Sequence, residues 1–220
     1  MVFTLLTTDY ARFSYNYEKE SRGGGTMSLY HMSQTLALGD ELKADFDRIS
    51  ALCQPFIQAL ERGEECFYTM VLNGKYLFAV LSKFRLREWS DYAKWATEGA
   101  FEYIRRTEYP DCPSRLYSMF YYDDLTNCRK LYEYDWGEET EEERNKVHLF
   151  EIELQDPEPK RFDMCLYDAA YDAMSDHQDV QAVLENARAY FSGGRTDRPV
   201  WEILSDRKAV AVKDVTEVLR

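Results

Sequence analysis

The sequence predicts an α+β domain. Segments with strand-like and helix-like patterns follow one another at unequal spacing, without the regular alternation that a parallel βαβ sheet requires. Hydrophobic residues make up 45% of the 220 residues, so the chain has enough apolar surface to bury a core. Residues 146–154 alternate apolar and polar side chains, which is typical of a strand with one buried face.

The first half of the chain is expected to contain a strand, a long helix and a hairpin. The segment 28–33 (SLYHMS) is short and apolar, as in a strand. Residues 40–63 have a helical pattern, and Pro55 within them must either begin a helix or kink one. Two apolar runs within 64–82 are joined by an Asn-Gly pair, a strong hairpin signal. The alternative for this segment is a buried helix, because its apolar runs are nearly continuous.

The second half is expected to contain three helices and four strands at unequal spacing. Ser90 is placed to cap one helix, and Asp123 or Asp124 is placed to cap the next. A further helix begins at Asp179 and is stopped by Gly193. The expected helices are 90–106, 123–134 and 179–194, and the expected strands are 114–122, 146–154, 199–204 and 208–215.

The chain is expected to form one working domain, residues 27–220, preceded by an N-terminal extension of residues 1–26. The end of this extension is polar and contains three consecutive glycines, a composition typical of a flexible joint. We find no internal repeat that would divide the remaining residues further.

The charge balance limits the partners. The formal net charge of −13 repels nucleic acid phosphates and anionic lipids, which argues against general nucleic-acid binding. The acidic run 138–144 is expected to be a solvated loop rather than a docking tail. No apolar run approaches the roughly 20 residues that span a bilayer, and the first residues lack the basic segment of a signal peptide. We therefore expect a cytoplasmic protein with no membrane partner.

Common catalytic and metal-binding motifs are absent from the sequence. The five cysteines are an odd number without a C-x-x-C pair, which suits a reducing compartment and predicts no metal site. The chain contains no G-x-G-x-x-G, no P-loop and no G-x-S-x-G. Gly193 and Gly194 precede Arg195, a cation suited to a phosphate, but a helix end followed by a loop explains the pattern more simply.

Three segments taken in order carry a resemblance to a known family. They are SLYHMS (28–33), PSRLYSMFYYDDLTNCRKLYE (113–133) and RPVWEILSDRKAVAV (198–212), with residues 146–164 fitting between the last two. This order resembles the ADP-ribosyltransferase superfamily, which includes the diphtheria-type toxins and the poly(ADP-ribose) polymerases. It resembles still more closely a bacterial domain family of unknown function attached to that superfamily. The resemblance implies two facing, split β-sheets with helices outside, and NAD⁺ in the cleft between the sheets.

The resemblance also implies roles for individual residues. His31 would hold the hydroxyls of the NAD⁺ adenosine or ribose, and Glu202 would be the catalytic glutamate of a late strand. The second-motif residue would come from the strand before the central helix, where Ser118 and Tyr121 fall on opposite faces by alternation. The alternatives are that His31 packs at the end of a strand and that Glu202 is a solvated strand residue.

Three arginines complete the expected site. Arg115 precedes the aromatic strand and is placed to bind a diphosphate, and its alternative is a surface salt bridge. The loop before Glu202 occupies the position at which such transferases recognise their target. Arg195 and Arg198 in this loop are therefore expected to meet an acidic or phosphorylated acceptor.

The predicted chemistry is cleavage of the nicotinamide–ribose bond of NAD⁺. Breaking this bond develops positive charge on the ribose, and a carboxylate held near the 2′-hydroxyl stabilises that charge. The first hypothesis is an NAD⁺-dependent ADP-ribosyltransferase or NAD⁺ glycohydrolase. The alternative is a catalytically inactive acidic binding module of the same fold. The acceptor stays open among protein, nucleic acid, small molecule and water.

Overall fold

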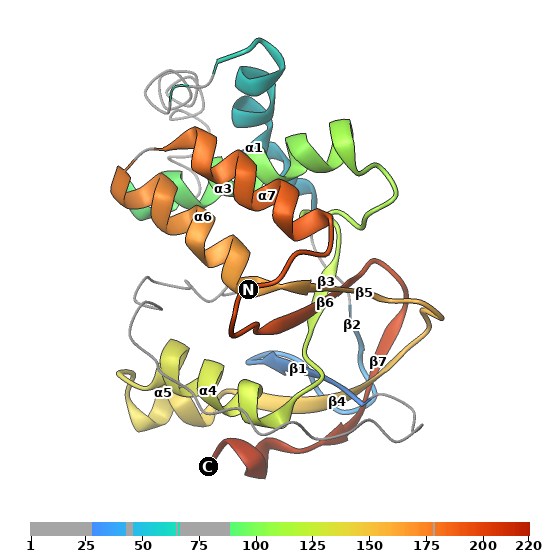
Figure 1. Ribbon diagram of the computed structural model, residues 1–220. Helices are drawn as coiled ribbons and strands as arrows, with labels where there is room; N and C mark the ends of the chain where they lie inside the picture. Colours follow the sequence, from blue (N-terminus) through green and yellow to red (C-terminus); the bar gives the residue numbers. More distant parts are fainter. Residues whose placement is uncertain (1–27, 43–45, 65, 67–88, 178) are drawn as a thin grey trace. The chain divides into compact units, whose positions relative to one another are not determined.

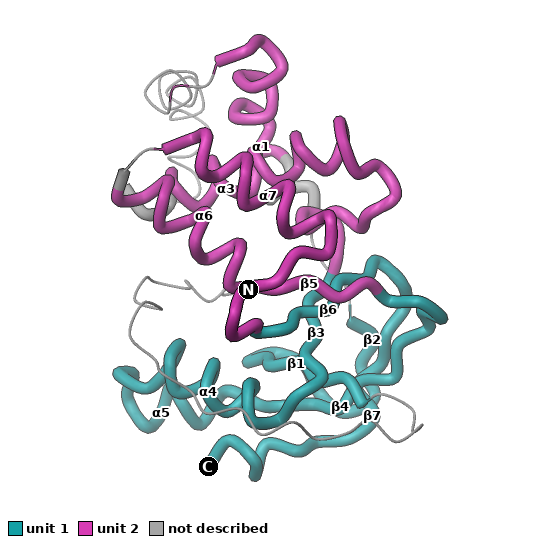
Figure 2. Tube along the Cα trace, in the orientation of Figure 1, with its two compact units in different colours: residues 1–43, 119–159, 200–220 teal, residues 44–118, 160–199 magenta. Residues whose placement is uncertain are grey.

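The chain folds into helices and two antiparallel sheets, which confirms the α+β class (Figure 1). The computed structural model describes residues 28–42, 46–64, 66, 89–177 and 179–220. Two compact units are formed: unit 1 comprises residues 1–43, 119–159 and 200–220, and unit 2 comprises residues 44–118 and 160–199 (Figure 2). The expected N-terminal extension and the apolar runs of the expected hairpin lie outside the described residues.

A four-stranded antiparallel sheet forms the larger part of unit 1. Its strands, in spatial order, are β1 (Leu29–Ser33), β4 (His148–Leu154), β7 (Ala209–Asp214) and β2 (Glu41–Leu42). The strands β1, β4 and β7 fulfil the sequence prediction. The prediction for residues 41–42 was wrong: they lie in β2 and pair with β7, and the helix α1 (Phe46–Glu61) begins later.

The second sheet contributes β3 (Met119–Tyr121) and β6 (Trp201–Ser205) to unit 1, and they pair antiparallel. The strand β3 is shorter than the expected 114–122. Ser114 holds the preceding residues in a turn, because its carbonyl accepts from the Tyr117 N–H at 3.1 Å and its hydroxyl from the Leu116 N–H at 3.2 Å. The backbone therefore becomes extended only from Met119 onward.

The core of unit 1 lies between its two sheets. Tyr121 and Ile203 from the second sheet join buried residues of the first sheet in one cluster, whose other members are Leu29, Leu42, Phe150, Ile152, Ala209 and Ala211. The opposite face of β4 carries Leu149, which packs against the helix α4 (Leu125–Trp136). The two sheets therefore face each other, and α4 covers the outside of the larger one.

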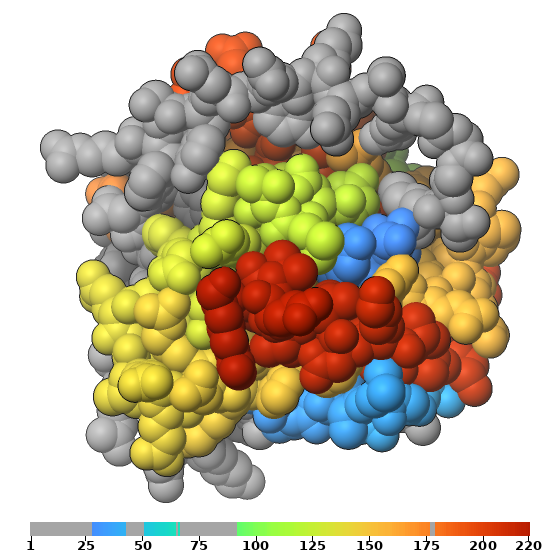
Figure 3. Space-filling view, turned by 90° about the horizontal axis from the view of Figure 1, so that it is seen from below, coloured from blue at the N-terminus to red at the C-terminus, as the bar shows by residue number. Residues whose placement is uncertain are grey.

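Helix ends in unit 1 follow local capping chemistry. Asp124 caps α4 by accepting from the N–H groups of Thr126 and Asn127 at 2.7 and 3.2 Å. Of the two predicted capping residues, Asp123 and Asp124, the second is therefore the cap. The acidic run that was expected to be a loop contains the short exposed helix α5 (Glu141–Asn145), capped by Thr140. The 3₁₀ helix η3 (Thr216–Leu219) packs on α4 and β4, and Figure 3 shows this C-terminal segment in red at the surface.

Unit 2 is a helical assembly built around α3 (Trp89–Glu108). This helix packs against α1, α6 (Met164–His177) and α7 (Val180–Phe191), and the short strand β5 (Lys160–Asp163) leads into α6. Its core is aromatic, with the ring of Phe101 edge-on to three neighbours, Tyr167, Tyr190 and Phe191, at 5.2–5.9 Å. Tyr167 and Tyr190 are thus buried among helices.

Two of the predicted helix limits in unit 2 are confirmed and one is not. The helix α7 begins after its cap Asp179, and Gly193 follows its end with a φ of 82°, a left-handed conformation that glycine adopts without strain. Ser90 lies inside α3 rather than at its cap, because the helix already begins at Trp89.

Gly99→Ala should destabilise unit 2. A Cβ at Gly99 would lie 2.8 Å from the Cβ of Phe56 and 3.1 Å from the carbonyl oxygen of Cys53, so α1 and α3 would have to move apart. We expect the overpacking cost of about 1–3 kcal/mol to exceed the gain in helix propensity of roughly 1 kcal/mol. The free energy of unfolding in urea should fall, whereas Gln58→Ala on the exposed side of α1 should change it by less than about 0.5 kcal/mol. Equal stability of both variants would mean that the helices are not in close contact at Gly99.

Candidate functional site

His31 lies where the two sheets of unit 1 part. The strands β1 and β3 meet at a single bridge, in which Tyr30 and Tyr122 exchange backbone hydrogen bonds of 2.8 and 2.9 Å. In a continued antiparallel ladder, the carbonyl of Phe120 would accept from the N–H of Met32. It is instead 2.9 Å from Nδ1 of His31. The imidazole thus replaces the backbone N–H of Met32 as the partner of this carbonyl, at the point where β1 and β3 separate.

This contact defines the chemical state of His31. A carbonyl oxygen can only accept, so Nδ1 carries the proton and donates to Phe120. Desolvation lowers the pKa of His31 below its usual value, although the bond to Phe120 opposes this shift. The ring is therefore neutral at pH 7, and in this tautomer its Nε2 carries a lone pair that can accept a hydrogen bond.

Of Ser118 and Tyr121, the two candidates for the second-motif residue, Tyr121 has a ring contact with His31. The two rings lie edge-on with centroids 6.1 Å apart. Tyr121 is completely buried, and burial together with the charge of Asp156 raises the pKa of its hydroxyl. Within the described part of the chain, this hydroxyl has no hydrogen-bond partner. An unpaired buried hydroxyl is unusual in a folded protein. The hydroxyl of Tyr121 therefore keeps its capacity to donate and to accept a hydrogen bond.

Glu202 is the second residue of β6 and is only 1% exposed. The solvated alternative for this residue is therefore wrong. The next residue, Ile203, pairs with Tyr121 and lies with it in the core. Because successive strand side chains point to opposite faces, Glu202 points away from that core. His31, Tyr121 and Glu202 thus lie on three strands of unit 1, β1, β3 and β6, but Glu202 is not on the face that Tyr121 shares with Ile203.

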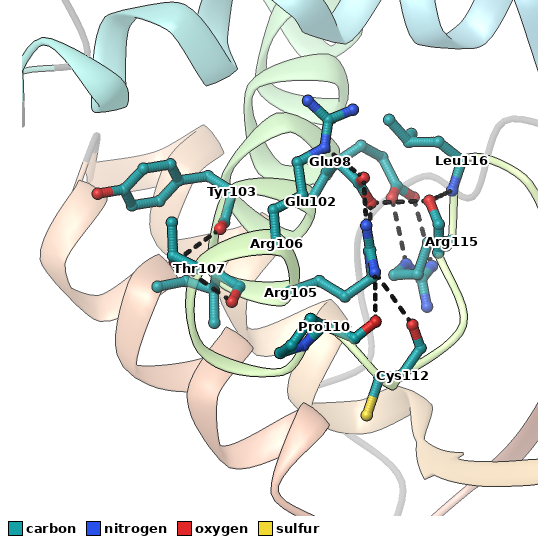
Figure 4. A network of polar contacts seen from close by, with 12 residues as sticks. Glu98, Glu102, Tyr103, Arg105, Arg106, Thr107, Pro110, Cys112, Arg115 and Leu116 are labelled. Atoms are coloured by element: carbon teal, nitrogen blue, oxygen red, sulfur yellow. Dashed lines mark hydrogen bonds and ion pairs between the residues drawn. The ribbon is translucent and has the colours of Figure 1, made fainter.

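Arg115 belongs to unit 2 and is held in a buried network (Figure 4). Its guanidinium donates to both carboxylate oxygens of Glu98 at 3.2 and 3.3 Å and to the hydroxyl of Tyr190 at 2.9 Å. The guanidinium carbon also lies 3.9 Å from the ring centre of Tyr167. Arg115 is 8% exposed, so its ion pair is not the surface salt bridge considered above. These contacts favour a structural role over diphosphate binding.

Glu102 organises the other half of this network. It accepts from Arg105 at 2.9 Å, from Arg106 at 2.7 Å and from the hydroxyl of Ser114 at 2.7 Å. Burial alone would raise the pKa of Glu102, but these hydrogen bonds outweigh it and hold the pKa below its usual value. Ser118 ends this segment of unit 2; it is buried, and its hydroxyl has no hydrogen-bond partner in the described residues.

The loop that carries Arg195 and Arg198 is anchored by the side chain of Asp163. Oδ2 of the buried Asp163 accepts from the N–H and the hydroxyl of Thr196 at 2.7 and 2.8 Å, and its Oδ1 accepts from the N–H of Cys165 at 3.1 Å. Arg195 and Arg198 are exposed. An open cavity of about 270 Å³ is lined by Arg195, Thr196, Asp197 and Pro199. The loop is thus a fixed, cationic feature of unit 2.

Sequence reasoning missed two groups that position these residues. The carbonyl of Phe120 orients His31, and a backbone group leaves no mark in a sequence motif. Asp163 anchors the arginine loop, and its only signal was its place directly before the helix α6. Among the described residues, no group of three or more His, Cys, Asp or Glu could hold a metal ion.

The fold and the site together define an α+β protein in which two antiparallel sheets part at a neutral, backbone-anchored histidine. Residues 29–217 match the model of a family described as a protein of unknown function (DUF2441), and the chain belongs to this family. No curated protein matches the chain. In the part of the chain that the structure describes, no helix is both long enough and apolar enough to cross a membrane.

Proposed function

We propose that this protein is an NAD⁺-dependent ADP-ribosyltransferase or NAD⁺ glycohydrolase that acts in the cytoplasm. The observation that carries the proposal is His31, a neutral imidazole fixed at the point where β1 and β3 part. A bound sugar needs a hydrogen-bond acceptor of defined direction, and Nε2 of a ring anchored through Nδ1 is such an acceptor. The resemblance of the SLYHMS segment to the first motif of the ADP-ribosyltransferases supports the same role.

The proposed role of His31 is to accept a hydrogen bond from a ribose hydroxyl of NAD⁺. Because the ring is uncharged, it adds no repulsion as positive charge develops on the ribose. The bond from Nδ1 to Phe120 prevents the ring from turning, so its orientation requires no rearrangement when NAD⁺ binds.

The proposed role of Glu202 is to stabilise the ribosyl cation. A carboxylate that is shielded from water interacts more strongly with a nearby charge than a solvated one does. The burial of Glu202 and its place on β6, next to the strand of Tyr121, support this role. Since Glu202 points away from the core that contains Tyr121, the proposal requires the substrate to reach the opposite face of β6.

The second candidate is a catalytically inactive binding module of the same fold. It is favoured by Arg115, because the expected diphosphate-binding guanidinium is engaged by Glu98 and Tyr190. Titration calorimetry with NAD⁺ separates the two candidates. Binding accompanied by nicotinamide release supports the enzyme, and absence of binding at millimolar NAD⁺ supports the inactive module.

His31→Ala should weaken NAD⁺ binding by about 1–3 kcal/mol, the cost of an unpaired polar contact. The melting temperature should also fall slightly, because the carbonyl of Phe120 loses its donor. His148→Ala is the matched control, since His148 is a half-buried histidine of the same unit on β4, and it should leave NAD⁺ affinity unchanged. If His31→Ala lowers only the melting temperature and binds NAD⁺ normally, His31 merely packs at the end of its strand.

A further inference from the structure

A thiol and an amine of unit 2 meet in a place that the proposed function does not use. Nζ of Lys160 lies 3.7 Å from Sγ of Cys112, although the two residues are far apart in sequence. The same Nζ donates to the carbonyl of Asp111 at 2.7 Å. The amine is therefore held beside the sulfur by a neighbouring backbone group and does not depend on the weak contact to sulfur alone.

The position of Cys112 is fixed by the end of α3. The N–H of Cys112 donates to the carbonyl of Tyr109 at 3.0 Å and closes a turn. Nη1 of Arg105 donates to the carbonyls of Pro110 and Cys112, both at 3.2 Å. Figure 4 shows the carbonyl of Cys112 directed toward Arg105 and its sulfur on the far side. The sulfur also lies 3.7 Å from the carbonyl of Phe191.

Accessibility distinguishes this thiol from the structural cysteines. Cys53 and Cys128 are completely buried, and burial raises the pKa of the Cys53 thiol, and that of Cys128 to about 12, which makes both inert. Cys112 is half-buried and Lys160 is exposed. A small oxidant can therefore reach the pair, while a bulky second thiol meets a sulfur that is partly covered.

We propose that Cys112 and Lys160 form a reversible covalent N–O–S cross-link when the protein meets hydrogen peroxide. The thiol of Cys112 attacks one peroxide, giving a sulfenic acid and water. The amine of Lys160, after its ammonium releases a proton to solvent, takes an oxygen from a second peroxide and becomes a hydroxylamine, with loss of water. The hydroxylamine oxygen then attacks the sulfenic sulfur, and the sulfenic hydroxyl leaves as a third water. Four molecules of an added thiol reverse the link, restoring both side chains with one water and two disulfides.

The link closes within one chain and within unit 2. It joins the turn after α3 to the first residue of β5. Closing such a loop restricts the unfolded chain, so the oxidised form gains stability without a change of fold. The pair is thus a redox-modification site, independent of the proposed NAD⁺ chemistry.

Mass spectrometry of the peroxide-treated full chain tests this proposal. Trypsin should release the segments 107–115 and 147–161 as one joined species, with one oxygen more and two hydrogens fewer than the sum of the two peptides. Cleavage after Lys160 should be blocked, and excess dithiothreitol should return the separate peptides. Sulfenic acid alone would add an oxygen without removing hydrogens and would leave the peptides apart.

Two variants provide the controls. Lys160→Arg keeps a cation that donates to the Asp111 carbonyl but lacks the primary amine, so the joined species should disappear completely. Cys66→Ser removes an exposed cysteine elsewhere and should leave the yield unchanged. The proposal is overturned if peroxide sufficient to oxidise Cys66 in the unaltered protein leaves the two peptides separate, or if Cys112 is recovered in a disulfide with another cysteine.

Discussion

Glu202→Gln is expected to slow nicotinamide release by ~10²–10³-fold, equivalent to about 2.7–4 kcal/mol of transition-state stabilisation. Glutamine keeps the size and hydrogen-bonding capacity of the side chain but removes the charge that favours the ribosyl cation. The affinity for NAD⁺ should change much less, because the interaction belongs mainly to the transition state. The measurement is the initial rate of nicotinamide release, beside calorimetric NAD⁺ affinity and the melting temperature of each variant.

Glu153→Gln is the matched control for this experiment. Glu153 is an exposed glutamate on β4 of the same unit, and its charge should have little influence on the rate. If the unaltered protein releases nicotinamide and Glu202→Gln does so equally fast, Glu202 is not the catalytic glutamate. If the rate falls only in proportion to a loss of folded protein, the buried carboxylate acts on stability instead.

Arg115→Met is expected to lower the free energy of unfolding by about 3–5 kcal/mol, because it leaves the carboxylate of Glu98 buried without this partner. The variant also removes the hydrogen bond to Tyr190 and the contact with the ring of Tyr167. Replacing both Arg115 and Glu98 with methionine should restore much of the loss, since a buried ion pair often resembles well-packed apolar groups in net stability. Urea unfolding followed by circular dichroism gives the free energy of unfolding of the unaltered protein, the single variant and the double variant.

The exposed pair of Arg188 and Glu108 is the control for burial. It joins two helices of the same unit at 2.9 Å, but both side chains are more than a third exposed. Arg188→Met should therefore cost only about 0–1 kcal/mol. If Arg115→Met costs no more than Arg188→Met and instead abolishes NAD⁺ binding, Arg115 is the diphosphate ligand first expected from its position in the sequence.

Local chemistry explains why much of the fold could be predicted. The cap at Asp124, the stop at Gly193 and the alternation of β4 each depend on a few neighbouring residues, so they are visible in one sequence. The helix α6 was missed although its signal was present. Met164, Tyr167, Ala170, Tyr171 and Met174 are buried at helical spacing, and Asp163 precedes the helix and accepts from the N–H of Cys165 in its first turn.

The environment of the site residues could not be predicted in the same way. The tautomer of His31 depends on a carbonyl 89 residues away. Whether Arg115 is a ligand-binding residue or a core residue depends on Glu98 and Tyr190, which lie 17 and 75 residues from it. Contacts of this range form only when separate helices or strands pack together. A motif shows which residue type is present, but it does not show which partner that residue contacts in the folded protein.

The anchoring of Thr196 by Asp163 has a kinetic consequence for any partner of the arginine loop. Displacing the loop would remove two donors from a fully buried carboxylate, so the arrangement resists motion. A partner that meets Arg195 therefore encounters a surface that is already ordered. Its association rate should depend on diffusion and on ionic strength, and not on a preceding conformational step.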